Sequence, residues 1–359
     1  MSHLSNFQAL LIENNYDAAI ITNKLNQRYL SDFDFDDGVV LVTREESYLL
    51  TDSRYVEAAR AQVTKEMQVM LPMQGQMTAL QELLHKHACH RVALEGDSVS
   101  YAAFERYRTT FGDAELTGEA SAFLKKLRVH KDDGELEAIA RAQELTDAAF
   151  AHVLKCMTPK MTEIEVALEL EFYMRRNGAE GLAFDTIAVS GSNSSRPHGV
   201  PRYQTLEKGF LTMDFGARVN GYCSDMTRTV ILGRADADMK KLYRTVLSAQ
   251  KAALEAAQEG VRCRELDAIA RNMIDGAGYK GCFGHSLGHG VGMFIHEAPG
   301  LSSAAAEDSV LERGHVVTFE PGIYIEGKYG CRIEDMVAVC NDGSIRNFTK
   351  SPKEMIELF

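Results

Sequence analysis

The fold is decided by the stretch Phe210-Leu-Thr-Met-Asp-Phe-Gly-Ala-Arg-Val-Asn-Gly-Tyr-Cys-Ser-Asp-Met-Thr-Arg-Thr-Val-Ile-Leu232, in which Asn220-Gly221 separates two extended runs. An Asn-Gly pair between apolar runs is the strongest short-range signal of a β-hairpin, so we expect these two residues to form its turn. This turn places Asp214 opposite Thr227. Asp225, two residues before Thr227, then lies on the same sheet face as Asp214, about 7–8 Å away along the diagonal.

Both aspartates are expected in apolar surroundings, where an unpaired carboxylate costs several kcal/mol or takes up a proton. A cation between Asp214 and Asp225 would remove that cost, and we expect Gly216, opposite Asp225, to leave space open. The alternative is an aspartate pair held by Arg218 or Arg228 in an ordinary ion-pair network. The hairpin alone favours neither interpretation.

Two glutamates interrupt apolar strand patterns nearer the C-terminus, in Val316-Val-Thr-Phe-Glu320-Pro-Gly-Ile-Tyr324 and in Gly330-Cys-Arg-Ile-Glu334-Asp-Met-Val-Ala-Val339. Either glutamate alone would more often be a surface residue at a strand end. Arg332 lies two residues before Glu334 and therefore shares its sheet face. The apolar flanks favour a buried role for both glutamates.

Three histidines lie in the glycine-rich stretch Gly284-His-Ser-Leu-Gly-His-Gly-Val-Gly-Met-Phe-Ile-His296. Its glycines oppose a regular helix, and no His-Glu-x-x-His is present. A zincin site with His285 and His289 on one helical face is therefore disfavoured. One such histidine is more often structural than a ligand, whereas three within twelve residues favour a site.

We predict a two-metal site with four carboxylates and one imidazole as ligands: Asp214, Asp225, His289, Glu320 and Glu334. Hard oxygen ligands with one imidazole suit Mn²⁺, which we place first, or Co²⁺, Zn²⁺ or Fe²⁺. Bridging carboxylates set two such ions about 3.5–4 Å apart, and a water between them would be a hydroxide near neutral pH. This hydroxide would attack a peptide carbonyl while Glu320 shuttles the proton. His296, or else His198, could donate a hydrogen bond to the developing oxyanion.

The motifs resemble the "pita-bread" metallopeptidases (family M24B), and most closely the Xaa-Pro peptidases, aminopeptidase P and prolidase. The similarity rests on Asp214-Phe-Gly with Asp225, Gly288-His-Gly-Val-Gly with His296, Glu320-Pro-Gly, Arg332-Ile-Glu334, Asn26-Gln-Arg-Tyr-Leu-Ser-Asp-Phe33, Thr51-Asp-Ser-Arg-Tyr55 and Ser190-Gly-Ser-Asn-Ser-Ser-Arg-Pro-His198. The resemblance implies an α/β creatinase-like N-terminal domain and an α+β pita-bread catalytic domain with a pseudo-twofold repeat. It also implies a homodimer, in which the N-terminal domain of a neighbouring subunit helps to close the site.

The resemblance further implies roles for single residues. Asp214 would hold one metal, His289 and Glu320 the other, and Asp225 and Glu334 would bridge both. Four further residues would bind substrate, stabilise the reacting carbonyl or support the metal shell: His198, His285, His296 and Arg332. Asp32 departs from the glycine that relatives often carry in the N-terminal motif, which leaves the contribution of that loop to the pocket open.

The activity that we place first is Xaa-Pro aminopeptidase, which hydrolyses the bond between an N-terminal residue and proline. Xaa-Pro dipeptidase on the same scaffold is the alternative, and the substrate in either case is a small peptide with proline at its second position. A non-catalytic binding protein and a metal-free amidinohydrolase resembling creatinase are both disfavoured by the five intact ligands. A methionine aminopeptidase is disfavoured by the additional N-terminal domain.

Two domains are expected, 1–124 and 125–359, because 359 residues suit two domains of about 150 residues each. Short apolar runs alternate with helical patterns in the first 120 residues, which predicts an α/β domain. The charged stretch from Lys125 to Gly134 marks the boundary. Residues 161–178 align without gaps with residues 261–278 and predict two related capped helices.

Composition excludes several classes of protein. The 39 basic and 51 acidic residues give a net charge of −12 without a long basic run, which disfavours nucleic acid and anionic membranes as partners. Seven scattered cysteines and the absence of a signal peptide or a long apolar run favour a cytoplasmic protein with reduced thiols. His85, His87 and His90 crowd a predicted helix end and are expected to be exposed there, not bound to a metal.

Overall fold

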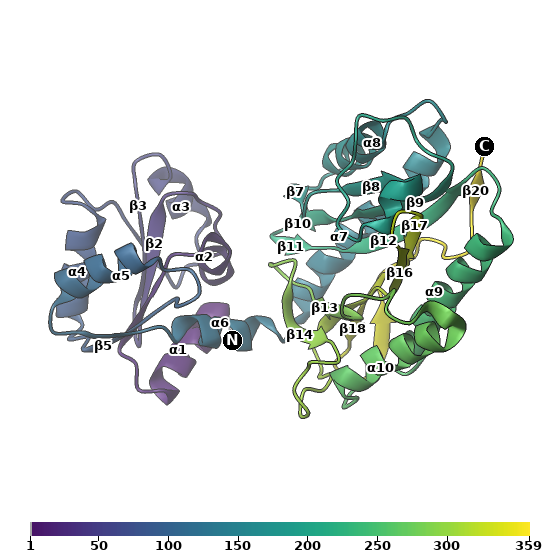
Figure 1. Cartoon of the computed structure of the whole chain (residues 1–359). Coiled ribbons are helices and arrows are strands. Elements are labelled where there is room, and N and C mark those ends of the chain that lie inside the picture. The colour runs from purple at the N-terminus through teal and green to yellow at the C-terminus, as the bar shows by residue number, and fades with distance from the viewer. Residues whose placement is uncertain (1) are drawn as a thin grey trace. The chain divides into compact units, whose positions relative to one another are not determined.

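The computed structural model describes residues 2–359, and the chain divides into two units, one that ends at Arg128 and one over Val129–Phe359 (Figure 1). Each unit is built around its own β-structure and its own buried apolar residues. The expected combination of an α/β first domain with an α+β second domain is confirmed.

The first unit is a six-stranded sheet in the order β4-β3-β2-β1-β5-β6, with helices packed against it. Its strands are β1 (Ala18–Ile21), β2 (Gly38–Thr43), β3 (Ser47–Thr51), β4 (Gln68–Met70), β5 (Arg91–Leu94) and β6 (Glu115–Thr117). Its helices are α1 (His3–Glu13), α2 (Lys24–Ser31), α3 (Val56–Gln62), α4 (Gln76–Lys86), α5 (Tyr101–Phe111) and α6 (Ala120–Arg128). Every side chain of β1 and β3 is buried, as is typical of strands covered on both faces.

The second unit combines four helices with several small sheets. Its helices are α7 (Asp133–Cys156), α8 (Glu163–Arg176), α9 (Ala237–Glu255) and α10 (Cys263–Ile274), with short helical turns η1 (Gly191–Ser195) and η2 (Asp275–Tyr279). Its strands are β7 (Gly181–Leu182), β8 (Ile187–Ser190), β9 (Gly209–Phe215), β10 (Ala217–Val219), β11 (Tyr222–Cys223), β12 (Met226–Leu232), β13 (Gly288–Gly290), β14 (Glu297–Leu301), β15 (Val316–Phe319), β16 (Gly322–Ile325), β17 (Tyr329–Arg332), β18 (Asp335–Val339), β19 (Ile345–Asn347) and β20 (Glu357–Leu358). The sheets have the orders β20-β12-β9-β8, β11-β10-β7, β14-β13-β15-β18-β19 and β16-β17.

The predicted first hairpin is confirmed in its register. Asn220 and Gly221 adopt φ of 49° and 86°, the positive values that a type I′ turn requires. Asp214 pairs with Thr227 where β9 runs antiparallel to β12. The pairing of β10 with β11 keeps the same register up to the turn.

The space expected beside Gly216 is absent. A Cβ atom on Gly216 would lie 1.9 Å from the carbonyl oxygen of Ser224, so this glycine permits a close approach of two backbones. The ladder of β9 and β12 ends at the pair Phe215 and Met226. The expectation of an open gap was wrong because the chain is interrupted and repacked at this point.

The second hairpin repeats this interruption. Phe319 pairs with Asp335 in β15 and β18, and Gly322 pairs with Arg332 in β16 and β17, so one register runs through both ladders. Glu320 and Glu334 fall in the break between them. Both hairpins therefore pass from one sheet into another at the positions of their carboxylates.

Two helix pairs pack against these hairpins. One core joins side chains of α7 and α8 with β9 and β12, and the other joins α9 and α10 with β15 and β18. α8 begins with a capping box of Thr162 and Glu165, as the sequence predicts, whereas the N-cap of α10, Arg262, makes no side-chain cap. Gly178 and Gly278 both have positive φ near the helix ends, in agreement with the 100-residue repeat.

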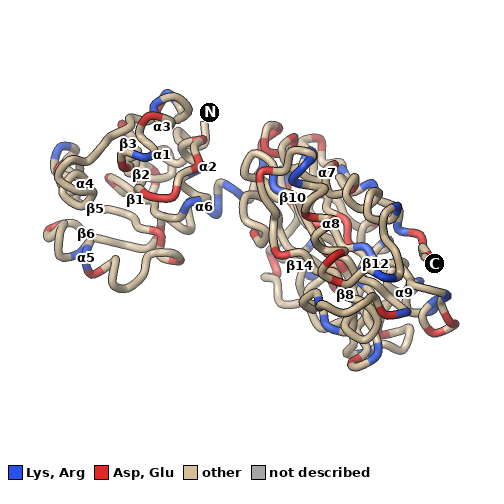
Figure 2. Tube along the Cα trace, turned by 90° about the horizontal axis from the view of Figure 1, so that it is seen from above, with Lys and Arg blue, Asp and Glu red and all other residues tan. Residues whose placement is uncertain are grey.

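Lys and Arg positions are interspersed with Asp and Glu positions along both units (Figure 2). Over residues 2–359, no helix is long and apolar enough to cross a membrane. All seven cysteines are free. His85 and His90 are exposed as expected, whereas the expectation is wrong for His87, whose side chain is only 14% exposed and whose Nε2 lies 2.8 Å from the hydroxyl of Tyr48.

Candidate metal centre

Nine side chains singled out in the sequence line one cavity of about 450 Å³ in the second unit. They are Asp214, Asp225, His289, Glu320 and Glu334, together with His198, His285, His296 and Arg332. Asp214 lies near the end of β9, the other three carboxylates lie in the two hairpin breaks, and β13 supplies His289. Segments more than a hundred residues apart in the sequence thus converge on one site.

His289 lies at the centre of the carboxylates. Its Nε2 is 3.5 Å from Oδ2 of Asp225 and 3.3 Å from Oε1 of Glu320. Ligand atoms of Asp225, His289 and Glu334 all lie within 4.8 Å of one another. Nδ1 of His289 lies 3.1 Å from the carbonyl oxygen of Gly290, to which it can donate only if it carries the proton. That tautomer leaves a lone pair on Nε2, facing the carboxylates, as in most metal-bound histidines.

Asp214 has one engaged and one unengaged oxygen. Its Oδ2 accepts a hydrogen bond from Nη2 of Arg332 at 2.7 Å. Its Oδ1 is buried and has no hydrogen-bond partner among residues 2–359. A buried carboxylate oxygen without a partner costs stability, so its position is the clearest sign that a cation belongs here.

The carboxylates repel one another. Burial, and then the charges of Glu334 and Asp214, raise the pKa of Asp225 well above its usual value. Burial and the charges of Glu320 and Asp214 likewise raise the pKa of Glu334 well above its usual value. Glu320 differs: burial alone would raise its pKa, but the hydrogen bond and charge of His289 bring that pKa down to about 2.

Arg332 lines the cavity and contacts several of its polar groups. The alternative interpretation of the sequence had instead considered Arg218 or Arg228 as partners of the aspartates. Nε of Arg332 donates to Thr227 Oγ1 at 2.9 Å and its Nη1 to the Tyr324 hydroxyl at 2.7 Å. Arg228 instead pairs with Asp335 at 2.9 Å, and Arg218 lies 3.4 Å from Glu180. The alternative of an aspartate pair held by Arg218 or Arg228 is therefore wrong.

Glycines allow the His289 strand to pack between its neighbours. A Cβ atom on Gly288 would lie 1.9 Å from the carbonyl oxygen of Thr318, and one on Gly290 would lie 2.2 Å from that of Ala298. Larger side chains at these positions would push His289 away from the carboxylates. Glycine therefore sets the depth of the imidazole in the cavity.

Several residues at the site were missed in the sequence. Thr227 donates to Oε2 of Glu334 at 2.7 Å, and Thr318 donates to Oε1 of Glu320 at 3.1 Å. The hydroxyl of Tyr324 lies 2.9 Å from Nε2 of His285. The register could have indicated Thr227, which faces Asp214, whereas no local pattern singles out Tyr324.

The donor set fits divalent cations. Four buried or partly buried carboxylates face one imidazole lone pair and one arginine, which leaves negative charge uncompensated. Oxygen donors with one nitrogen and no sulfur match hard or borderline ions. These residues therefore form a plausible carboxylate and histidine metal site.

The chain matches known families along almost its whole length. The profile of the Creatinase/Prolidase N-terminal domain matches residues 3–130, and that of metallopeptidase family M24 matches residues 137–341. The chain is 36% identical over 346 residues to an Xaa-Pro dipeptidase of Pyrococcus furiosus, covering 96% of each protein.

Two solved structures have the same fold. An Xaa-Pro dipeptidase from Bacillus anthracis is 38% identical, with 99% of each chain covered and a TM-score of 0.93. An X-Pro aminopeptidase from Thermotoga maritima is 36% identical, with 96% of this chain and 98% of that chain covered and a TM-score of 0.89.

Proposed function

The chain belongs to metallopeptidase family M24, and on that premise we propose that it acts as an Xaa-Pro dipeptidase, which hydrolyses a residue–proline dipeptide. The motifs alone led us to place aminopeptidase activity first. Dipeptidases from Pyrococcus furiosus, Pyrococcus horikoshii and Bacillus anthracis favour the alternative. The single observation that supports metal-dependent hydrolysis is the orphaned Oδ1 of Asp214 among three other carboxylates and His289.

We propose the ligand roles that the resemblance implies, and the position of each donor supports them. Asp214 would hold one cation through its free oxygen, while Nε2 of His289 and Glu320, 3.3 Å apart, would hold the other. Asp225 and Glu334 would bridge both, which accounts for their mutual repulsion without metal. Mn²⁺ is the first candidate, with Co²⁺, Zn²⁺ or Fe²⁺ as alternatives.

The protein's own groups would move the proton and orient the substrate. Bound divalent cations polarise a carbonyl and bring the pKa of a water close to neutrality. The pKa of Glu320 is lowered in the metal-free site, so its carboxylate is ionised there and could accept a proton and pass it to the proline nitrogen. Burial lowers the pKa of His296, so its neutral ring can donate a hydrogen bond to the developing oxyanion.

The remaining features of the proposal concern the substrate and the assembly. His198 is a second donor candidate at the cavity wall, and His285 and Arg332 are linked through Tyr324 where a carboxylate or carbonyl of the peptide could bind. We further propose a homodimer in the cytoplasm whose substrate is a small peptide with proline at its second position.

Substrate length decides between the two activities. The metal-stripped protein, reloaded with Mn²⁺, Co²⁺ or Zn²⁺ in turn, is incubated with an Xaa-Pro dipeptide, an Xaa-Pro-Yaa tripeptide and a proline-free dipeptide. Amino-acid release from the first substrate alone would support the dipeptidase. Release of the first residue from the tripeptide would establish the aminopeptidase, the activity named for the Thermotoga maritima structure. Inactivity with every metal would overturn both.

A further inference from the structure

A second group of potential ligands lies between α7 and α8, outside the 450 Å³ cavity. His152 and Cys156 are four residues apart on α7 and face the same side, and Glu169 reaches them from α8. Nε2 of His152 lies 2.5 Å from Oε1 of Glu169 and 3.7 Å from Sγ of Cys156. We propose that these three side chains form a third cation site, selective for Zn²⁺.

The chemistry of the donors sets the selectivity. A thiolate, an imidazole and a carboxylate are all established ligands of zinc, at about 2.0–2.3 Å. The catalytic cavity offers oxygen and nitrogen but no sulfur, which suits harder ions. The cysteine would thus give this cluster a stronger preference for zinc than the catalytic cavity has.

The surroundings leave room for binding. A cavity of about 480 Å³ borders His152 and Glu169 and can hold a water as the fourth ligand. The ring of His152 stacks on Tyr173 with centroids 4.5 Å apart, which fixes the plane of the imidazole. Arg176 lines the same cavity, and its positive charge opposes every cation there, so binding depends on direct bonds to the three side chains.

Binding requires two local changes. Tetrahedral zinc separates its ligand atoms by about 3.3 Å, so the 2.5 Å contact between His152 and Glu169 must lengthen. Both side chains are partly exposed, at 33% and 40%, and a change of rotamer at Glu169 would lengthen the contact while His152 stays stacked on Tyr173. Burial and the charge of Glu169 raise the pKa of the Cys156 thiol, so zinc must displace its proton.

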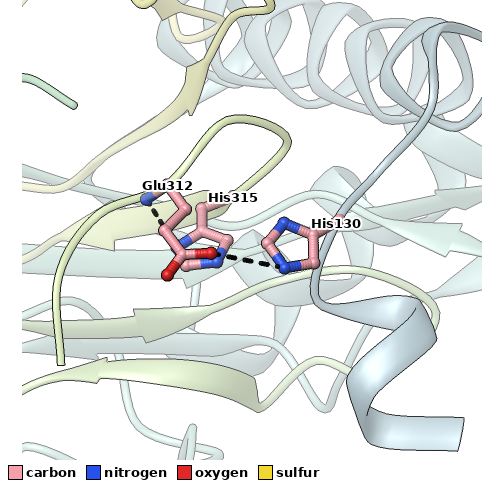
Figure 3. Close-up of side chains that lie close together, drawn as sticks. All are labelled: His130, Glu312 and His315. Atoms are coloured by element: carbon pink, nitrogen blue, oxygen red, sulfur yellow. Dashed lines mark hydrogen bonds and ion pairs between the residues drawn. The ribbon is translucent and has the colours of Figure 1, made fainter. Parts of the chain in front are cut away.

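A similar cluster lacks the right proton arrangement. Figure 3 shows His130, Glu312 and His315; the centroids of the two rings are 5.0 Å apart, and Nε2 of His130 lies 3.5 Å from Oε2 of Glu312. Nδ1 of His315 accepts the backbone N–H of Glu312 at 3.1 Å, so Nε2 carries the proton of the neutral ring. Burial lowers the pKa of His315 to about 3 and keeps that ring neutral. Within residues 2–359, no backbone N–H donates to a ring nitrogen of His152, which makes the α7–α8 cluster the better ligand set.

Cobalt absorption tests the site on the full-length protein. Co²⁺ bound to a thiolate gives a charge-transfer band in the near ultraviolet, and the proposed catalytic ligands include no cysteine to produce one. We expect this band in the wild type, its loss in Cys156→Ser and in His152→Ala, and its retention in Cys340→Ser, which removes a similarly half-buried thiol. Zinc content measured after gel filtration should fall by one equivalent in Cys156→Ser.

Three outcomes would overturn the proposal: no band in the wild type, a band unchanged in Cys156→Ser, or equal zinc content in the two proteins. Circular dichroism confirms that each variant is folded. If Cys156→Ser does not fold, His152→Ala carries the same test. Peptidase activity is not the readout, so failure of this proposal is separate from failure of the proposed function.

Discussion

Glu334 and Asp335 are consecutive buried carboxylates with opposite electrostatic surroundings. Asp335 accepts from Arg228 at 2.9 Å and from Asn347 at 2.8 Å and pairs with Lys353, so although burial opposes it, its pKa is lowered. Glu334 faces other carboxylates, and its pKa is raised well above the usual value. Burial alone therefore does not mark a functional carboxylate. A functional carboxylate is marked by burial together with too few positive charges nearby to balance it.

Asp225→Asn should have the largest effect. It removes one proposed bridging charge, and we expect kcat/KM for an Xaa-Pro dipeptide to fall by about 10³-fold or more at saturating Mn²⁺. The measurement is steady-state kinetics on protein shown to be folded by circular dichroism. Full activity would contradict the assignment of Asp225.

Asp335→Asn tests the compensated side of the comparison. It removes the negative charge that pairs with Arg228 and Lys353, and breaking a buried ion pair costs about 3 kcal/mol. We expect the free energy of unfolding in urea to fall by about that amount while the folded variant still binds Mn²⁺. An unchanged urea midpoint would show that the network adds no stability.

The stability of the metal-free protein should depend on pH with opposite signs through Asp225, whose pKa is raised, and Asp335, whose pKa is lowered. Because the pKa of Asp225 is raised in the folded state, the native protein binds more protons than the unfolded chain, and stability falls as pH rises above about 3.9. Each unit of pKa shift is worth about 1.4 kcal/mol. Metal-free Asp225→Asn should therefore be more stable than the wild type near neutral pH and equal to it near pH 4.

Added Mn²⁺ provides the control for this pH series. It should restore the wild type more than Asp225→Asn, because the cations bind the ionised carboxylates. Thermal unfolding with and without metal measures both effects. A wild-type protein that is unaffected by metal across the pH range would contradict the comparison.

Tyr324→Phe should have the smallest effect. It removes the hydroxyl that joins Arg332 and His285, and a hydrogen bond of this kind is worth about 1 kcal/mol, or roughly fivefold in kcat/KM. Tyr329→Phe, which alters a tyrosine on the adjacent strand, is the matched control. A loss of stability without a change in kinetics would show a purely structural role.

Much of the local structure could be predicted from the sequence. Asn220-Gly221 fixes a turn, and a strand period of two then fixes which residues face each other, so the pairing of Asp214 with Thr227 followed. The interruption at Gly216 did not follow, because it depends on the backbone of Ser224 approaching within contact distance. Hairpin rules describe ladders and not the points where chains leave them.

The composition of the candidate site was predicted better than its connections. Strand patterns single out carboxylates in apolar runs, but they do not tell which arginine reaches them: Arg332 bonds Asp214, whereas the alternative interpretation had considered Arg218 or Arg228. Tyr324 was missed for the same reason: its hydroxyl contacts His285 only once β16 has packed against the loop that precedes β13. A contact between two segments that are far apart in the sequence leaves no pattern in either segment from which it could be predicted.

The unbroken register across both hairpins has a consequence for how sequences of this kind can vary in length. The turns at Asn220-Gly221 and around Gly327 lie beyond the carboxylates along each hairpin. Residues added at these turns would lengthen the hairpin tips and leave the strands that carry the carboxylates unchanged. One residue added within β9 or β15 would turn every following side chain to the opposite face. Insertions and deletions among related chains should therefore gather at the hairpin tips and be excluded from their bases.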